Sequence, residues 1–102
     1  MVAVAHLAEV PRGSKLGRIV AGTRILLVNL GTGIRAYEDR CGHRDVPLCK
    51  GKLEGGILTC KAHEWRYDAA TGCGIERPGV RLRSYPVRVE AARILVDIGG
   101  GR

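Results

Sequence analysis

Hydrophobic residues along the chain fall into short segments of strand length. Residues 24–30 form a nearly continuous apolar run, RILLVNL, which is followed by the turn-forming sequence GTG at 31–33. Residues 34–39, IRAYED, then resume with alternating character. Two strand-like segments joined by a glycine-containing turn predict a β-hairpin.

A second hairpin is predicted near the C-terminus. Apolar and polar residues alternate in 85–90, YPVRVE, and again in 93–98, RILVDI. The turn between these segments falls at 91–92. One more strand is predicted over 14–21, SKLGRIVA.

The segment between the two hairpins is rich in turn-forming residues. It contains two short strand candidates, at 57–60 and 64–68, and no stretch of ten residues with helical periodicity. Phenylalanine is absent and aromatic residues make up only 4% of the chain, so the core must consist mainly of Val, Ile, Leu and Ala. Branched side chains suit a pleated surface. We therefore expect an all-β protein whose two hairpins flank a loop-rich insertion.

The net charge of +7 is unevenly distributed along the chain. Residues 1–38 carry five basic and two acidic side chains, residues 77–102 carry six and two, and residues 39–76 carry six of each. No segment is apolar enough to span a bilayer, and the N-terminus lacks the features of a signal peptide. We expect a cytoplasmic protein whose cysteines stay reduced, which favours a metal or catalytic role for them over a disulfide framework.

Two short motifs bring together cysteine and histidine. The first is Cys41-x-His43, and the second, after a spacer of sixteen residues, is Cys60-x-x-His63. Structural zinc sites use such ligands, but their pairs usually stand two to four residues apart, so the first motif is cramped around a single ion. With two metal ions, each loop can send its cysteine to one ion and its histidine to the other.

These motifs resemble the signature of the Rieske family, C-x-H followed by C-x-x-H. In a Rieske centre two cysteines hold one iron of a [2Fe–2S] cluster and two histidines hold the other. The resemblance implies that Cys41 and Cys60 bind the inner iron, and that His43 and His63 bind the outer iron. The stretch LEGGILTCKAHEW, residues 53–65, is especially similar to the Rieske ferredoxins of toluene-type diiron monooxygenases.

The resemblance also implies an architecture. Rieske proteins are β-sandwiches in which a small, loop-rich cluster-binding subdomain is inserted into a larger antiparallel β-subdomain. For this chain we expect a single Rieske domain over 1–102, with a cluster-binding subdomain at about 40–79. The basal subdomain would then consist of about 1–39 and 80–102.

Three further residues acquire expected roles from the family. Its high-potential members carry a serine two residues after the second histidine ligand and a tyrosine four residues after it, both donating hydrogen bonds to cluster or ligand sulfur. Trp65 and Tyr67 stand at these positions, so we expect a potential toward the low end of the Rieske range of about −150 to +300 mV. Pro78, in the loop 75–79, would help to cover the cluster. The plainer interpretations are a packing tryptophan, an ordinary strand tyrosine and a turn proline.

The other cysteines fall outside the signature. Val46 and Ala62 occupy positions that are extra cysteines in the respiratory branch of the family, so its disulfide is absent here. We expect Cys49 and Cys73 to be small, semi-buried residues, rather than a bridged pair or extra ligands. His6 matches no motif, and a surface or half-buried histidine is expected.

The sequence thus predicts a soluble, monomeric ferredoxin that is not itself an enzyme. It would carry single electrons from a flavin-dependent reductase to an oxygenase, with a toluene-type monooxygenase as the favoured acceptor. An alternative is a Rieske-like subunit of a ring-hydroxylating dioxygenase or nitrite reductase system. A zinc-stabilised nucleic-acid binder is a distant alternative, prompted by the pI of about 9.8, but a basic patch alone is insufficient for it. We expect no nucleic-acid or membrane partner.

Overall fold

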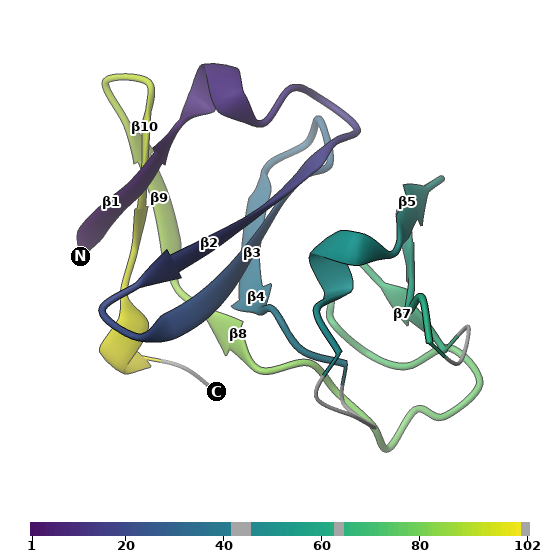
Figure 1. The fold of residues 1–102 in the computed structure, drawn as a ribbon. Coiled ribbons are helices and arrows are strands. Elements are labelled where there is room, and N and C mark those ends of the chain that lie inside the picture. The colour runs from purple at the N-terminus through teal and green to yellow at the C-terminus, as the bar shows by residue number, and fades with distance from the viewer. Residues whose placement is uncertain (42–45, 63–64, 101–102) are drawn as a thin grey trace.

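The computed structural model describes residues 1–41, 46–62 and 65–100, and within these ranges the fold is all-β without an α-helix. The strands form three antiparallel sheets, ordered β1-β10-β9, β2-β3-β4-β8 and β5-β6-β7. Figure 1 shows β5 and β7 on one side of β4, and β1, β9 and β10 on the other. The strands are β1 Val2–His6, β2 Lys15–Val20, β3 Thr23–Asn29, β4 Ile34–Glu38, β5 Lys52–Glu54, β6 Ile57–Thr59, β7 Arg66–Asp68, β8 Ser84–Tyr85, β9 Val87–Glu90 and β10 Arg93–Val96. The short 3₁₀ helices are η1 Leu7–Glu9, η2 Leu48–Lys50 and η3 Ile98–Gly100.

Both predicted hairpins are confirmed. In the first, Asn29 of β3 pairs with Ile34 of β4. In the second, Glu90 of β9 pairs with Arg93 of β10. Its two turn residues, Ala91 and Ala92, have φ values of 50° and 64°. Positive φ at both positions matches the twist of the flanking strands, a conformation that Asn-Gly usually supplies.

The apolar run in β3 is explained by burial on both faces of this strand. Successive side chains of a strand point to opposite faces of the sheet. Leu26 and Val28 belong to a core cluster on the side of the β5-β6-β7 sheet. Ile25 and Leu27 belong to a second cluster on the side of the β1-β10-β9 sheet. Strand β3 therefore separates two cores, and the first of them contains the candidate site.

Strand β1 was not predicted from the sequence. This strand pairs with β10 along one edge of its sheet, and only Val4 of its five residues is buried. Its alternation involves alanine as much as valine, which gives a weak apolar stripe.

The structure has no helix among its described residues that is long and apolar enough to cross a membrane.

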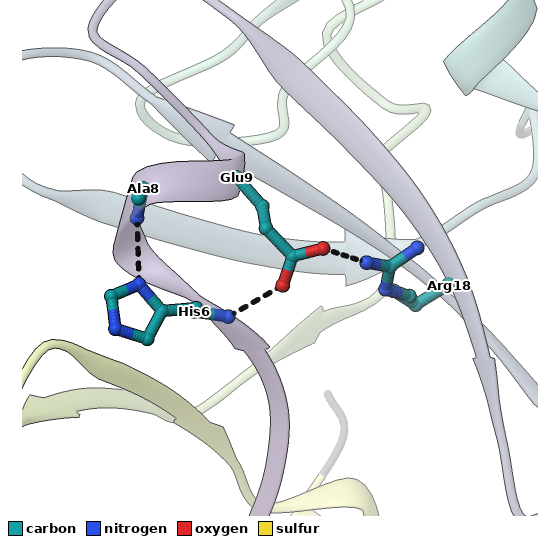
Figure 2. Close-up of polar contacts among 4 residues, drawn as sticks. All are labelled: His6, Ala8, Glu9 and Arg18. Carbon is teal, nitrogen blue, oxygen red and sulfur yellow. Dashed lines mark hydrogen bonds and ion pairs between the residues drawn. The ribbon is translucent and has the colours of Figure 1, made fainter.

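His6, which matched no motif, closes the end of β1. Its Nδ1 accepts a hydrogen bond of 3.1 Å from the backbone N–H of Ala8, and its own N–H donates to Glu9 Oε1 at 2.9 Å (Figure 2). This reciprocal arrangement is a capping box, which satisfies N–H groups at the start of η1. Glu9 also pairs with Arg18 of β2. The expectation of a surface histidine is confirmed, with a structural role added.

Candidate metal centre

The two cysteines of the predicted ligand set lie in one core. Cys41 follows β4 and Cys60 follows β6, and both are fully buried members of the cluster that contains Leu26 and Tyr67. The two predicted histidine ligands, His43 and His63, lie outside the described residues. The structure thus brings together two reduced thiols from two loops that are distant in the sequence.

Each of the two cysteine loops contains a backbone hydrogen bond of the same kind. The N–H of Cys41 donates to the carbonyl of Val46 at 2.9 Å, and the N–H of Cys60 donates to the carbonyl of Trp65 at 2.7 Å. In each case the acceptor lies five residues after the cysteine. Each cysteine is therefore tied through its backbone N–H to the far end of its own loop.

Asp39 anchors the first loop to the β-scaffold. It is the only buried charged side chain in the described part of the chain. Its Oδ1 accepts a hydrogen bond of 2.9 Å from the N–H of Cys49, and Lys15 Nζ donates to the carbonyl of Cys49 at 2.6 Å. Asp39 and Cys49, which flank the first loop, are therefore held to each other and to β2. The anchoring role of Asp39 was not predicted from the sequence, because an aspartate at the end of a strand is typical of an ordinary turn.

Tyr67 reaches the sulfur of the first cysteine. The tyrosine is fully buried on β7, and its hydroxyl oxygen lies 3.3 Å from Cys41 Sγ. A metal-bound cysteine is a thiolate and offers no proton, so in the loaded protein the hydroxyl must donate. This contact supports the role suggested by the resemblance and argues against an ordinary strand aromatic.

Two contacts join the third loop, residues 75–79, to Trp65 and to its neighbour Arg66. The guanidinium carbon of Arg77 lies 4.1 Å from the centre of the Trp65 ring, a cation–π contact. Arg66 Nε donates to Glu76 Oε1 at 2.8 Å and holds the pKa of this exposed carboxyl below its usual value. Trp65 is half-buried against the cysteine-bearing core, which fits a packing role. The contact between Arg77 and Trp65 was not predicted from the sequence.

Pro78 lies in an exposed turn of the same third loop. The turn is closed by a hydrogen bond of 2.9 Å from the N–H of Val80 to the carbonyl of Arg77. This geometry agrees with the plain interpretation of a turn proline. A covering role for Pro78 over the histidine-bearing side stays a prediction, because that side lies outside the described residues.

Cys49 and Cys73 are free, half-buried thiols, so the bridged alternative is not observed. Burial raises the pKa of the Cys49 thiol, and the neighbouring Asp39 adds to this effect. A thiol that resists ionisation is a poor metal ligand. Cys73 lies beside β7, where its carbonyl accepts a hydrogen bond of 2.8 Å from the N–H of Asp68, and it forms an isolated bridge with Arg81.

The donors present suit a cluster that is held partly by thiolates. Two fully buried cysteines, one of them touched by a hydroxyl donor, provide half of a Cys₂His₂ set. No cluster of three or more metal-binding side chains occurs in the described ranges. That finding does not test the ligand set, since the two histidines lie outside those ranges.

Comparison with known proteins settles the family. A family model described as a Rieske [2Fe-2S] domain matches residues 1–86. The chain belongs to the Rieske family. Its cofactor is accordingly a Rieske-type [2Fe–2S] cluster, as the motifs predicted, and the distant zinc interpretation is set aside.

The relatives of this Rieske protein include ferredoxins of oxygenase systems. The ferredoxin component of the alkene monooxygenase system of Xanthobacter autotrophicus is 42% identical over 73 residues, which is 71% of this chain and 60% of that protein. The ferredoxin component of the naphthalene 1,2-dioxygenase system of Pseudomonas aeruginosa is 32% identical over 93 residues, 90% of this chain and 89% of that protein. Both relatives are named as ferredoxin components, in agreement with the prediction of an electron carrier rather than an enzyme.

A solved ferredoxin confirms the Rieske fold. The ferredoxin of carbazole 1,9a-dioxygenase from Nocardioides aromaticivorans IC177 superposes with a TM-score of 0.82 at 30% identity. The superposition covers 93% of this chain and 94% of the other. The predicted fold class, an all-β Rieske-like sandwich, is therefore confirmed.

The Tyr67 contact makes a prediction about the reduction potential. A hydrogen bond to a ligand sulfur stabilises the more negative, reduced cluster and so raises the potential. Removing a bond of about 1 kcal/mol with Tyr67→Phe should lower the potential by about 40 mV, as measured by protein-film voltammetry.

Tyr37→Phe is the matched control for this change. Tyr37 lies in the same core, and burial raises the pKa of its hydroxyl to about 12. It donates to the carbonyl of Ala69 at 2.7 Å and not to a cysteine. Its loss should weaken the fold and leave the potential within a few millivolts. Equal shifts in both variants would remove the special role assigned to Tyr67.

Proposed function

We propose that this Rieske protein shuttles single electrons from a flavin-dependent reductase to an oxygenase, with Cys41, His43, Cys60 and His63 as the cluster ligands. When bound, the cluster accepts and releases one electron at a time. The observation that supports the ligand assignment is the burial of Cys41 and Cys60, each of which donates its N–H to the carbonyl five residues later, with the Tyr67 hydroxyl on Cys41.

The protein residues around the cysteines have three tasks. The buried core keeps water from the sulfur atoms, since Cys41 and Cys60 are completely inaccessible. Tyr67 supplies a fixed donor to sulfur. The contacts of Trp65 with Arg77 and of Arg66 with Glu76 hold the third loop against β7. Such a rigid, dry surrounding limits the rearrangement that accompanies each change of charge.

The division into subdomains is part of the same proposal. The sheet β5-β6-β7 lies entirely within 40–79, and the other two sheets are built from 1–39 and 80–102. This arrangement supports a cluster-binding subdomain inserted into a basal β-subdomain. We also propose that the ferredoxin works as a monomer in the cytoplasm, where its two extra cysteines stay reduced.

The acceptor is a monooxygenase in our first hypothesis and a ring-hydroxylating dioxygenase in the second. The alkene monooxygenase ferredoxin has the higher identity, and the naphthalene dioxygenase ferredoxin matches over more of the chain. Supplying this chain in place of the ferredoxin of each system, and measuring product formation, separates the two. A nitrite reductase small subunit shares only the fold, at 16% identity.

Metal and sulfide analysis tests the proposed cluster. We expect two irons and two acid-labile sulfides per chain, and a rhombic electron paramagnetic resonance signal after reduction with dithionite. Histidine ligation should place the midpoint potential above about −150 mV, well separated from the value of about −400 mV typical of plant-type clusters with four cysteines. One zinc without sulfide would refute the proposal, and a potential near the plant-type value would refute the histidine ligands.

A further inference from the structure

A basic hollow lies directly beside the cysteine-bearing end of β4. Its volume is about 320 Å³, and its charged lining residues are Arg24, Glu38, Arg40 and Arg83. Backbone hydrogen bonds hold these segments together: Glu38 N–H donates to the carbonyl of Arg83 at 2.8 Å, and Asp39 N–H donates to the carbonyl of Arg24 at 3.0 Å. The hollow is thus part of the folded scaffold and does not depend on a single side chain.

The lining carries an excess of positive charge. Among the described residues of the lining there are three arginines and one carboxylate, and that carboxylate, on Glu38, lies 3.8 Å from Arg40. The guanidinium of Arg83 is placed over the Tyr85 ring, with its carbon 5.9 Å from the ring centre. Arg40 and Arg83 are exposed to solvent. Arginine presents a planar set of N–H donors that matches a carboxylate, so the hollow is suited to an acidic side chain.

The position of the hollow connects it with the cluster. Arg40 directly precedes Cys41 in the chain, and both follow the end of β4 at Glu38. The other two arginines of the lining come from the basic flanks of the sequence, Arg24 from 1–38 and Arg83 from 77–102. Residues 39–76 carry no net charge. The fold therefore brings positive charge from the two basic flanks next to the cysteine-bearing region.

We propose that this hollow docks an acidic segment, bearing Asp or Glu, of a protein that exchanges electrons with the ferredoxin. Complementary charge steers partners into register and speeds their encounter. A nucleic-acid partner is disfavoured because the aromatic residue of the lining, Tyr85, is only 6% exposed and offers no stacking face. The role in electron exchange rests on the proposed function, whereas the binding of an acidic chain does not.

Binding of a dye-labelled hexaglutamate peptide tests the hollow directly. Fluorescence anisotropy with the holoprotein at about 0.15 M salt restricts the effect to nearby charges, because the Debye length is about 8 Å. Arg83→Glu should weaken binding about tenfold, and Arg83→Gln should have an intermediate effect. The Arg83 side chain is exposed, and its backbone carbonyl, which accepts from Glu38, stays in place.

Arg93→Glu is the matched control. Arg93 is an exposed residue at the start of β10, paired in register with His6. Its substitution changes the net charge by the same amount at a position that does not line the hollow. It should weaken peptide binding less than about twofold. Equal losses in the two variants would overturn the proposal, since only net charge would then matter. Binding of inorganic pyrophosphate without binding of the peptide would overturn it as well.

A second measurement connects the hollow with electron exchange. Ferricyanide, an anionic oxidant, takes one electron from the dithionite-reduced protein and becomes ferrocyanide. Its second-order rate, followed by stopped flow, should fall about fivefold in Arg83→Glu and little in Arg93→Glu. An unchanged rate would separate the hollow from the electron path and overturn its role. If the wild-type protein carried no cluster, the proposed function would be refuted. The peptide titration of the folded protein would still test the hollow.

Discussion

Cys60→Ser should remove the cluster and the visible colour of the protein. Cys60 is completely buried, and its backbone N–H donates to the carbonyl of Trp65 at 2.7 Å. Serine fits the space, but its hydroxyl does not ionise at neutral pH and is a poor ligand for iron held by sulfur. We expect the iron content of the purified variant to fall at least about tenfold, as measured by colorimetric iron analysis beside the visible spectrum.

Cys73→Ser is the control that separates ligation from the loss of a cysteine. Cys73 is half-buried, and its N–H lies 3.2 Å from Thr71 Oγ1 in a turn next to β7. Its thiol should not touch the cluster, so this variant should keep its iron and its spectrum. A colourless Cys73→Ser, or a fully coloured Cys60→Ser, would show that the ligands are wrongly assigned.

The hairpins were predictable because they depend on neighbouring residues. In β3–β4 and β9–β10 the alternation and the turn together specify register within a dozen residues, and the structure reproduces both. Strand β1 was not predictable in this way. It is stabilised by pairing with β10, about ninety residues away in the chain, and its own side chains are mostly exposed.

The candidate cysteine ligands could be identified from the sequence because the spacing within each motif is a local property. Two ligand types at fixed intervals in two loops already favour a site with two metal ions, and the resemblance to the Rieske family, which the family model confirms, identifies these as the irons of a [2Fe–2S] cluster. The role of Tyr67 came from the resemblance and is supported by its contact with Cys41. By contrast, the anchor from Asp39 to Cys49 and the Arg77–Trp65 contact join residues ten and twelve positions apart through tertiary packing. No periodicity signals such pairs.

The two cores on either side of β3 explain how one small domain can carry a buried cluster. The core that contains Ile25 and Ile94 is purely a packing core of the basal sheets. The core that contains Leu26 and Leu58 also holds Cys41 and Cys60. The cysteines therefore rest on a strand that is stabilised independently from its opposite face, which limits motion of their surroundings.

Gly51→Ala should be the most destabilising single methyl addition in the region of the cysteines. Gly51 follows η2 and packs against the backbone of β6, where a Cβ would overlap the carbonyl oxygen of Thr59. A backbone oxygen cannot rotate away, so β5 or β6 must shift. Overpacking of this kind costs about 3 kcal/mol, which corresponds to a fall in Tm of about 12 °C or more for a domain of this size.

Gly79→Ala is the matched control for this steric argument. A Cβ on Gly79 would meet no atom within 4 Å, and its φ is outside the left-handed region. Its free energy of unfolding should stay within about 0.5 kcal/mol of wild type. Thermal unfolding of both holoproteins gives the comparison. Because Thr59 directly precedes Cys60, Gly51→Ala should also lose iron faster to a chelator than Gly79→Ala. Equal melting temperatures in the two variants would contradict the close approach of Gly51 to β6.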